Sequence, residues 1–480
     1  MRLGDRATLA DFAGLPALEL PRDVRDRLAQ DRAVVDAAAA GAAPVYGLNT
    51  GLGANLGHRI APEDIPRFQR QLIEGRAVAT GPALPPETGR GVLLARLVSI
   101  RGSGMSLSMV DHLLAVYAAG LSPRVPRFGS IGASDLTQNA VWALALLGSG
   151  TVWRDGAEVE AGRALAEAGI TLPALQPKDA MALINHGGLT TALSARALHA
   201  GGVALAMLRA AALLSYAGYD ANRDIFAPAV NALRPAPMQA ETAAWFAERL
   251  KGAQSPRRVQ EALSFRTIAP VLGAALDAQG RAVAVWADEA NGLSDSPAVL
   301  GDEAMRSTPN FHGPALALAL ESVALANAMC ANGAVQRAQR LMNPDLSGLP
   351  RYLTPEGGAS AGMVPAQKTA AALLAEVRRH AGPVTLDAAP VSETVEDMAP
   401  MTPQAALKLS GQAEALKLLA GYEALVAAQA IDLRGGALPP AVAALHSALR
   451  AEIPPLTADR PLGPAIETAA RVLARVAEAL

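Results

Sequence analysis

The sequence has few charged residues and few aromatic ones. Charged residues make up 18% of the 480 positions and aromatic residues 4%, and the formal net charge is −2. Because no basic block is present and few rings are available for stacking, we expect no nucleic-acid partner. Low charge on a chain this long also leaves apolar helix faces to be covered, which favours assembly with other subunits over a large helical monomer.

Cysteine is almost absent. The single Cys330 ends an apolar run over residues 323–330, so a disulfide framework is excluded and a reducing cytoplasm fits the chain. We expect this thiol to be a small buried hydrophobe rather than a reactive group. The seven histidines are scattered with no pair at the spacing of metal ligands, so no metal site is expected.

The sequence also lacks a recognisable signal peptide. Its first residues, MRLGDRATLADF, carry charges and contain no apolar core of the required length. The longest apolar stretches, such as residues 201–218, are rich in alanine and glycine and contain Arg209, so we interpret them as core helices rather than membrane spans. We expect a cytoplasmic protein with a small-molecule substrate and no membrane partner.

Apolar residues recur at helical spacing through long segments in which alanine and leucine dominate. This pattern predicts an all-α fold, mainly a bundle of long helices. The predicted helices cover residues 92–99, 106–119, 190–214, 256–289, 314–341, 364–379 and 403–433. Strands are expected only as small pieces, such as a hairpin over residues 151–160 with its turn at Asp155–Gly156.

Glycine, proline and polar residues gather in loops between these apolar segments. Such loops cover residues 46–57, 123–134, 173–188, 292–313 and 346–362. Catalytic groups tend to lie on loops that a rigid scaffold holds in place. Five such loops predict an active site assembled from distant parts of the chain.

The first of these loops reads YGLNTGLG over residues 46–53. Its three glycines allow a tight turn and a close approach to a ligand. The loop is not a dinucleotide fingerprint, because no strand–helix unit surrounds it, and it lacks the lysine of a phosphate-binding loop. Taken alone, it is a turn that contains a tyrosine.

Read with the other loops, YGLNTGLG closely resembles the YG-[IV]-NTGFG loop of the histidine, phenylalanine and tyrosine ammonia-lyases. Further matches follow in chain order: RGSG at 101–104, VP at 125–126, GSIGASDL at 129–136, ALIN at 182–185, QEALSFR at 260–266, Asn291 with Ser294, Asp295 and Pro297, NFHG at 310–313, and SETVED at 392–397. The resemblance covers roughly residues 40–400. It implies the fold of that family as one unit over the whole chain, with an active-site region over 1–200 and a helical region over 201–480.

The resemblance also implies roles for individual residues. Tyr46 stands where the family has the base that removes the β-proton of the substrate. Asn185 and Arg266 stand where the family binds the substrate carboxylate, a task that suits the planar fork of arginine. Phe311 resembles the aromatic wall beside the reacting centre. Glu396 stands where histidine-specific members bind the imidazole, which indicates a substrate with a polar heterocycle.

The chain departs from the family at the tripeptide that forms its electrophile. In the family, Ala-Ser-Gly cyclises and loses water to give 4-methylideneimidazol-5-one, and the glycine nitrogen attacks the alanine carbonyl. Here Ala133-Ser134 is followed directly by Asp135, so the glycine is missing. The other register, Gly132-Ala133-Ser134, lacks the central serine. We therefore expect no cofactor.

Other positions differ as well. Leu263 stands where the family has a catalytic tyrosine, Arg76 replaces a histidine of histidine-specific members, and His186 follows Asn185 where glycine is usual. We expect Arg76 and His186 to contact the substrate. Lys368 occupies a helix position that is ordinarily apolar, so it either pairs with Glu396 or reaches solvent.

These departures fit the ergothionase branch of the family, whose members lack the cofactor and release trimethylamine from ergothioneine. A trimethylammonium leaves as a neutral amine without help from an electrophile. The sequence therefore predicts a carbon–nitrogen lyase with Tyr46, Lys368 and Glu396 as catalytic residues. The alternatives are a histidine ammonia-lyase, a lyase for hercynine (the sulfur-free betaine) and an inactive homologue. The resemblance further implies a D2 homotetramer in which Tyr46, Arg266 and Glu396 meet from different chains.

Overall fold

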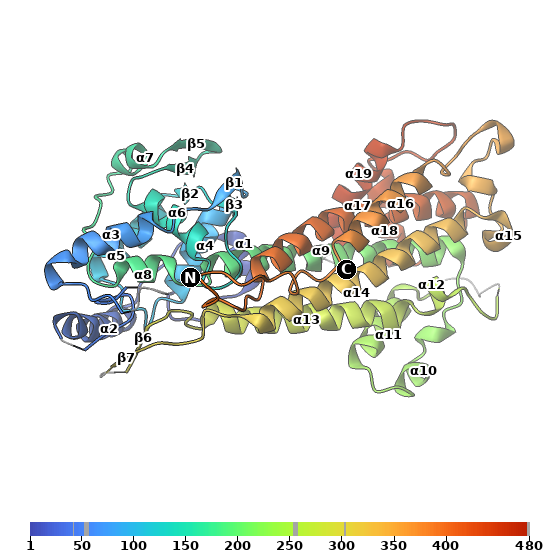
Figure 1. The fold of residues 1–480 in the computed structure, drawn as a ribbon. Helices are drawn as coiled ribbons and strands as arrows, with labels where there is room; N and C mark the ends of the chain where they lie inside the picture. Colours follow the sequence, from blue (N-terminus) through green and yellow to red (C-terminus); the bar gives the residue numbers. More distant parts are fainter. Residues whose placement is uncertain (42, 52–56, 253–257, 302–303, 478–480) are drawn as a thin grey trace. The chain divides into compact units, whose positions relative to one another are not determined.

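Helices dominate the computed structural model, which describes the chain except for residues 42, 52–56, 253–257, 302–303 and 478–480 (Figure 1). The chain forms two compact units, and each consists of three chain segments. Unit 1 comprises Met1–Arg196, Val283–Leu318 and Pro383–Leu407, and unit 2 comprises Ala197–Ala282, Ala319–Gly382 and Lys408–Leu480. The division expected at residue 200 lies near the first boundary, but two later segments return to unit 1.

Unit 1 contains mostly short helices and all the described strands. Its helices are α1 (Leu9–Gly14), α2 (Arg22–Ala40), η2 (Pro62–Asp64), α3 (Ile65–Glu74), α4 (Glu87–Val98), α5 (Leu107–Ala118), α6 (Leu136–Leu146), α7 (Ala161–Glu167) and α8 (Asp179–Ile184). Its strands are β1 (Thr80–Ala83), β2 (Ser122–Pro123), β3 (Pro126–Phe128), β4 (Thr151–Arg154), β5 (Ala157–Glu160), β6 (Ala298–Leu300) and β7 (Ala304–Arg306). The strands pair antiparallel, in the orders β1-β3, β2-β4-β5 and β6-β7.

Four long helices begin in one unit and continue into the other: α9 (Gly188–Tyr219), α13 (Ile268–Asn291), α14 (Pro314–Leu341) and α17 (Thr402–Arg434). The remaining elements of unit 2 are η3 (Asp224–Phe226), α10 (Pro228–Ala232), α11 (Pro237–Arg249), α12 (Leu263–Arg266), α15 (Pro344–Ser347), η4 (Arg351–Leu353), η5 (Gly357–Ala359), α16 (Ala366–Arg379), α18 (Pro440–Arg450) and α19 (Gly463–Val476). The helical fold and its small β pieces confirm the predicted fold class.

The core of unit 2 is one apolar cluster built from its long helices. Tyr216 packs against Phe226 and Phe265, with ring centroids 5.0 and 5.6 Å apart. Within this core the Arg337 guanidinium binds the Glu423 carboxylate at 2.6 Å. Cys330 is buried, and burial raises the pKa of its thiol to about 12, as expected of a structural cysteine.

The predicted hairpin is confirmed. Strands β4 and β5 pair from Thr151–Glu160 to Arg154–Ala157. The two turn residues, Asp155 and Gly156, have φ values of 50° and 81°. Positive φ at both central positions is what a two-residue hairpin turn requires.

One predicted helix is partly wrong. The pattern predicted a continuous helix over 256–289, but α12 begins at Leu263 and α13 at Ile268. The Asn222 side chain donates hydrogen bonds of 3.2 Å to the carbonyls of Arg258 and Val259. Because Asn222 lies far away in sequence, helical periodicity cannot reveal this competition for backbone acceptors.

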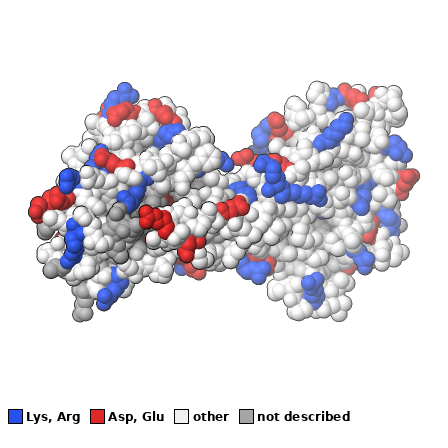
Figure 2. All heavy atoms as spheres, in the orientation of Figure 1, with Lys and Arg blue, Asp and Glu red and all other residues white. Residues whose placement is uncertain are grey.

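Three helical stretches among the described residues are long and apolar enough, by length and composition alone, to cross a membrane: Asp179–Tyr219, Ile268–Asn291 and Pro314–Leu341. Residues 201–218, which the sequence pattern identifies as a core helix, lie within the first of these stretches. In their most apolar windows, 67%, 44% and 50% of the residues are already buried within the protein. On the face drawn in Figure 2, lysine and arginine side chains are interspersed with aspartate and glutamate.

Candidate active site

Unit 1 contains a cavity of about 600 Å³ that collects several residues named by the sequence motifs. Tyr46, Arg76, Ala133, Asn185 and Glu396 all line it. These residues come from five separate parts of the chain. Three of the five predicted loops contribute to the cavity, whereas the described residues of loops 292–313 and 346–362 do not line it. The other lining residues are Gly75, Val78, Gly129, Ser130, Ile131, Leu136, Thr137, Met181, Val391, Ser392 and Glu393.

Asn49 organises the loop that places Tyr46. Its side-chain oxygen accepts a hydrogen bond of 2.8 Å from the Val45 amide, and its side-chain nitrogen donates one of 2.9 Å to the Ala43 carbonyl. Gly47 has a φ of 66°, which explains why glycine follows the tyrosine. Residues 52 and 53 of the motif lie outside the described residues.

Arg76 lies just beyond the end of α3, half-buried at the cavity. One of its nitrogens donates a hydrogen bond of 3.3 Å to the Leu72 carbonyl. Burial lowers the pKa of the guanidinium below its usual value, and the neighbouring Tyr46 and Glu396 oppose this shift. The cation that replaces the family histidine therefore lies within electrostatic range of both.

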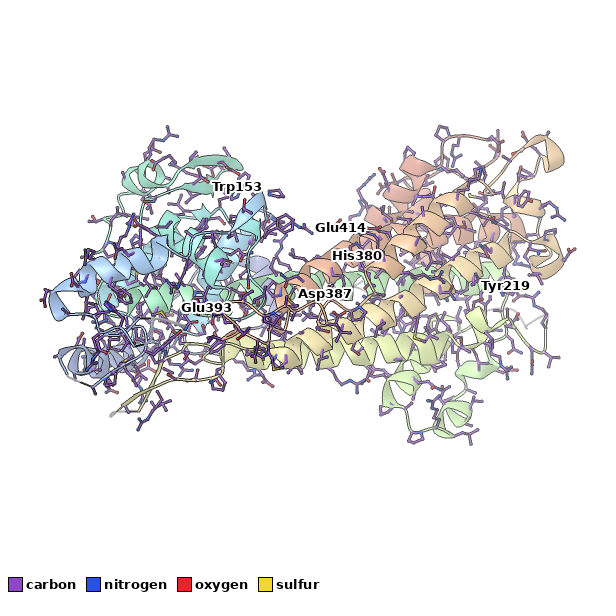
Figure 3. All side chains as sticks on the ribbon, viewed as in Figure 1. Trp153, Tyr219, His380, Asp387, Glu393 and Glu414 are labelled. Atoms are coloured by element: carbon purple, nitrogen blue, oxygen red, sulfur yellow. The ribbon has the colours of Figure 1, made fainter. Side chains whose placement is uncertain are left out.

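The Glu396 carboxylate belongs to a tight turn. Ser392 Oγ donates a hydrogen bond of 2.9 Å to Glu396 Oε1, and the Val391 and Glu396 backbones form a bridge. Three successive residues of the turn, Ser392, Glu393 and Thr394, have φ values of 54°, 54° and 69°. Glu393 also lines the cavity and is labelled in Figure 3, so two carboxylates of one turn are available to a polar ring.

Asp135 directly follows Ala133-Ser134 in the sequence, and its side chain is buried in the core. Its carboxylate accepts hydrogen bonds from Ser130 Oγ at 2.6 Å, from the Thr190 amide at 2.7 Å and from Thr190 Oγ1 at 3.0 Å. Burial raises the pKa of the Asp135 carboxyl above its usual value, and these donors oppose that shift. Asp135 is 1% exposed and precedes the first residue of α6.

The residues present do not fit the family's cofactor. Formation requires a glycine nitrogen after the serine, whereas here that nitrogen belongs to Asp135, whose side chain is fixed by three hydrogen bonds. The Asp135 carbonyl is also engaged, because it accepts the Asn139 amide at 3.0 Å as α6 begins. Ring closure would have to move Asp135, whose side chain is anchored in the core and whose carbonyl begins the hydrogen bonding of α6.

Asn139 ties the Ala133 loop to the turn that bears Asn185. Its side-chain nitrogen lies 2.8, 3.2 and 3.3 Å from the carbonyls of His186, Ile184 and Ser134. Nothing in the sequence points to Asn139, because an asparagine inside a helical pattern gives no local sign of a tertiary contact. Ser130 and Ser392 lie within the quoted motifs, but the motifs do not reveal that they bind Asp135 and Glu396.

His186 does not line the cavity, although we expected it to contact the substrate. It is 1% exposed, its Nε2 is 2.9 Å from the Leu183 carbonyl, and its Nδ1 accepts the Gly188 amide at 3.0 Å. Both ring nitrogens are engaged by backbone atoms. This geometry requires the proton on Nε2 and assigns His186 to holding the turn beside Asn185.

Lowering the pH should destabilise the protein through His186. Burial and the charge of Arg96 hold the pKa of His186 well below its usual value of about 6.5. An unfolded chain therefore takes up a proton that the folded chain excludes, and stability is lost as the pH falls below about 6.5. We expect the melting temperature to drop between about pH 7.5 and 5.5, and to drop less in His186→Asn. If the melting temperature changes equally with pH in the two proteins, this assignment is contradicted. Some dependence should remain in His186→Asn, because burial also lowers the pKa of His112.

Other predicted site residues lie elsewhere. Phe311 lines a second cavity of unit 1, of about 720 Å³, with Glu289 and Met398 among its walls. Arg266 and Lys368 belong to unit 2, where both are exposed. The predicted pairing of Lys368 with Glu396 thus joins residues of different units and stays a prediction.

The expectation that Tyr46 and Glu396 come from different chains is wrong. Both line the same cavity of one unit. The reason is that residues 383–407 belong to unit 1, although the chain passes through unit 2 before it reaches them.

Among the described residues no group of three or more histidine, cysteine, aspartate or glutamate side chains could hold a metal ion.

Comparison with known proteins agrees with the motifs. The family described as "Aromatic amino acid lyase" matches residues 5–452. The chain belongs to this family. It is 37% identical to the histidine ammonia-lyase of Sorangium cellulosum (strain So ce56) over 98% of this chain and 97% of that protein. It is 36% identical to the histidine ammonia-lyase of Deinococcus radiodurans, over 96% of this chain and 91% of that protein.

Solved structures of the same fold include enzymes of different reactions. The ergothionase from Treponema denticola, in complex with desmethyl-ergothioneine sulfonic acid, is similar with a TM-score of 0.94 and 27% identity. The alignment covers 100% of this chain and 99% of that one. Histidine ammonia-lyase from Trypanosoma cruzi gives a TM-score of 0.92 and 28% identity over 99% and 94% of the two chains. The protein is thus a carbon–nitrogen lyase of the histidine and aromatic ammonia-lyase family.

Proposed function

We propose that this lyase eliminates trimethylamine from a histidine-derived betaine, as an ergothionase does, without the family's electrophile. The observation behind this proposal is Asp135, which stands where cofactor formation needs glycine and whose carboxylate holds three buried hydrogen bonds. An enzyme without the electrophile needs a leaving group that departs unaided. A quaternary ammonium meets this requirement because it has no proton to lose and leaves as a neutral amine.

Residues of the cavity, together with Lys368, which does not line it, would supply the remaining chemistry. In the proposed reaction the Tyr46 oxygen takes the proton from the substrate Cβ. The electrons of the broken C–H bond form the Cα–Cβ double bond, and the Cα–N pair departs with trimethylamine. Glu396 accepts a hydrogen bond from a ring N–H, and Lys368 stabilises the charge that delocalises into the ring.

Asn185 and Arg266 would bind the substrate carboxylate, the roles that the family resemblance implies for them. Arg76 adds a cation beside Tyr46 and Glu396. In this site it favours the negative charge that develops as the β-proton is transferred.

The second candidate function is the deamination of L-histidine. Five bacterial relatives named histidine ammonia-lyase are 35–37% identical to this chain, whereas the solved structures of ergothionase and of the Trypanosoma cruzi histidine ammonia-lyase are 27% and 28% identical. The names of these relatives therefore support deamination of L-histidine more strongly than elimination from a betaine. Against it stands the missing glycine, since the α-ammonium of histidine is a poor leaving group unless an electrophile modifies it.

Intact mass and one substitution separate the two candidates. We expect the purified chain to have the mass of its sequence with no loss of water, because no glycine follows Ser134 to close the ring. Ser134→Ala should keep most of the activity, since the hydroxyl takes no part in the proposed reaction. A dehydrated mass, together with loss of activity in Ser134→Ala, would overturn the betaine proposal and restore the ammonia-lyase.

We also propose that the chain works as a homotetramer. Exposed apolar side chains along α14, namely Leu318, Leu325 and Met329, are available for contacts between subunits. Light scattering should give the mass of four chains, and a fully active monomer would contradict this assembly.

A further inference from the structure

The Asn185 side chain donates a hydrogen bond to a largely buried chain segment. Asn185 Nδ2 lies 2.5 Å from the Ser296 carbonyl, and both residues are 6% exposed. A peptide carbonyl can only accept a hydrogen bond, so Asn185 must turn its amide N–H₂ toward it. One N–H is thereby used, and the orientation of the remaining amide group is fixed.

The segment that supplies this carbonyl, Ser294 to Ser296, is here called the strap. Three hydrogen bonds connect it to neighbouring loops. The Gly187 amide donates to Ser294 Oγ at 3.0 Å, Thr308 Oγ1 donates to the Asp295 carbonyl at 2.7 Å, and the Thr308 amide donates to Ser296 Oγ at 3.1 Å. The strap therefore contacts the turn that follows Asn185 as well as Asn185 itself.

The centre of the strap is an ion pair inside the protein. Arg96 Nη1 and Asp295 Oδ1 are 2.6 Å apart, and their side chains are 0% and 1% exposed. A second cation, Lys178 Nζ, lies 3.9 Å from Asp295 Oδ2, an oxygen that has no hydrogen-bond partner among the described residues. A buried ion pair contributes little net stability compared with apolar residues of the same volume, but removal of one partner leaves a buried charge uncompensated.

We propose that Asp295 is a positioning residue: held by Arg96, it fixes the strap and thereby orients the Asn185 amide toward a carboxylate in the cavity. This inference rests on the proposed function, because it takes the ligand of Asn185 to be the substrate carboxylate. Asp295 itself does not line the cavity. Its effect passes through the Ser296 carbonyl.

The test measures binding rather than turnover, with urocanate and imidazole as probes. Both probes contain the ring, but only urocanate has a carboxylate. Asp295→Asn keeps the side-chain size and removes the charge that binds Arg96. We expect it to weaken urocanate binding about tenfold, the scale of one hydrogen bond to a charged group, and to leave imidazole binding unchanged. In steady-state assays the same variant should raise KM with little change in kcat.

A double-mutant cycle shows whether the effect passes through Asn185. In an Asn185→Ala background, Asp295→Asn should have little further effect on urocanate binding. Glu423→Gln is the matched control, because it breaks a comparably buried ion pair with Arg337 in unit 2 and should leave urocanate binding unchanged. If Asp295→Asn does not fold, Thr308→Val takes its place, since it removes the bond to the Asp295 carbonyl and leaves the buried charges intact.

The outcomes separate this inference from the proposed function. If Asn185→Ala weakens urocanate binding but neither Asp295→Asn nor Thr308→Val does, the positioning role is refuted and the function stands. Additive losses in the cycle also refute it. If Asn185→Ala leaves urocanate binding unchanged, the carboxylate role of Asn185 fails, and the inference fails with it.

Discussion

Tyr46→Phe should lower kcat by about 10²–10⁴, the range associated with loss of a positioned general base. The substitution keeps the ring and removes only the oxygen that takes the β-proton. Tyr46 is half-buried on a loop whose shape depends on Asn49 and Gly47, so the loop should survive. The measurement is steady-state turnover of the betaine substrate.

The control for this variant is ligand binding. Tyr46→Phe should bind urocanate about as well as the natural chain, because the ring and carboxylate contacts involve other residues. Exchange of the substrate Cβ proton with solvent should be lost together with turnover. A variant that keeps its kcat would show that Tyr46 is not the base.

Lys368→Met should reduce turnover by about two orders of magnitude or more, the effect expected for a preorganised electrostatic group. Lys368 lies in the first turn of α16 and is exposed in its unit, whereas Ala366 and Ala370 on the same helix are buried. Because the Lys368 side chain is exposed there, replacing it with methionine should leave the packing of the helix unchanged. In the proposed reaction, Lys368 stabilises the negative charge that delocalises into the substrate ring.

Two further variants make this prediction specific. Glu396→Gln should cause a similar loss, and the double variant should cost about as much as either single one, since residues that act as a unit are not additive. Lys251→Met removes another exposed lysine of unit 2, one that pairs with Glu248, and should leave turnover unchanged. An unchanged rate in Lys368→Met would identify Lys368 as a surface residue and remove a main sequence argument for ergothionase chemistry.

The elements that sequence predicted well are those whose signals are local. The predicted helix 314–341 has the bounds of α14, because a proline starts it and its periodicity is unbroken. The hairpin turn follows from Asp155–Gly156 alone. Where a distant side chain competes for backbone carbonyls, as Asn222 does at 258–259, the local pattern predicted helix and was wrong.

The candidate site shows the same limit. Motifs identified Tyr46, Arg76, Asn185 and Glu396, and the cavity collects all four. They could not give the direction of the His186 ring, which depends on the Leu183 carbonyl and the Gly188 amide. The strap was visible only as a family motif, because the contact of Asp295 with Arg96 spans 199 positions of the sequence.

We infer that this lyase releases a tertiary amine without the family's electrophile. Its most direct test is to incubate the purified enzyme in parallel with ergothioneine, hercynine and L-histidine, and to measure trimethylamine and ammonia. We expect trimethylamine from ergothioneine and no ammonia from L-histidine; trimethylamine from hercynine alone would keep the chemistry and change the substrate. Ammonia from L-histidine would contradict the account, and no amine from any of the three would point to an inactive homologue.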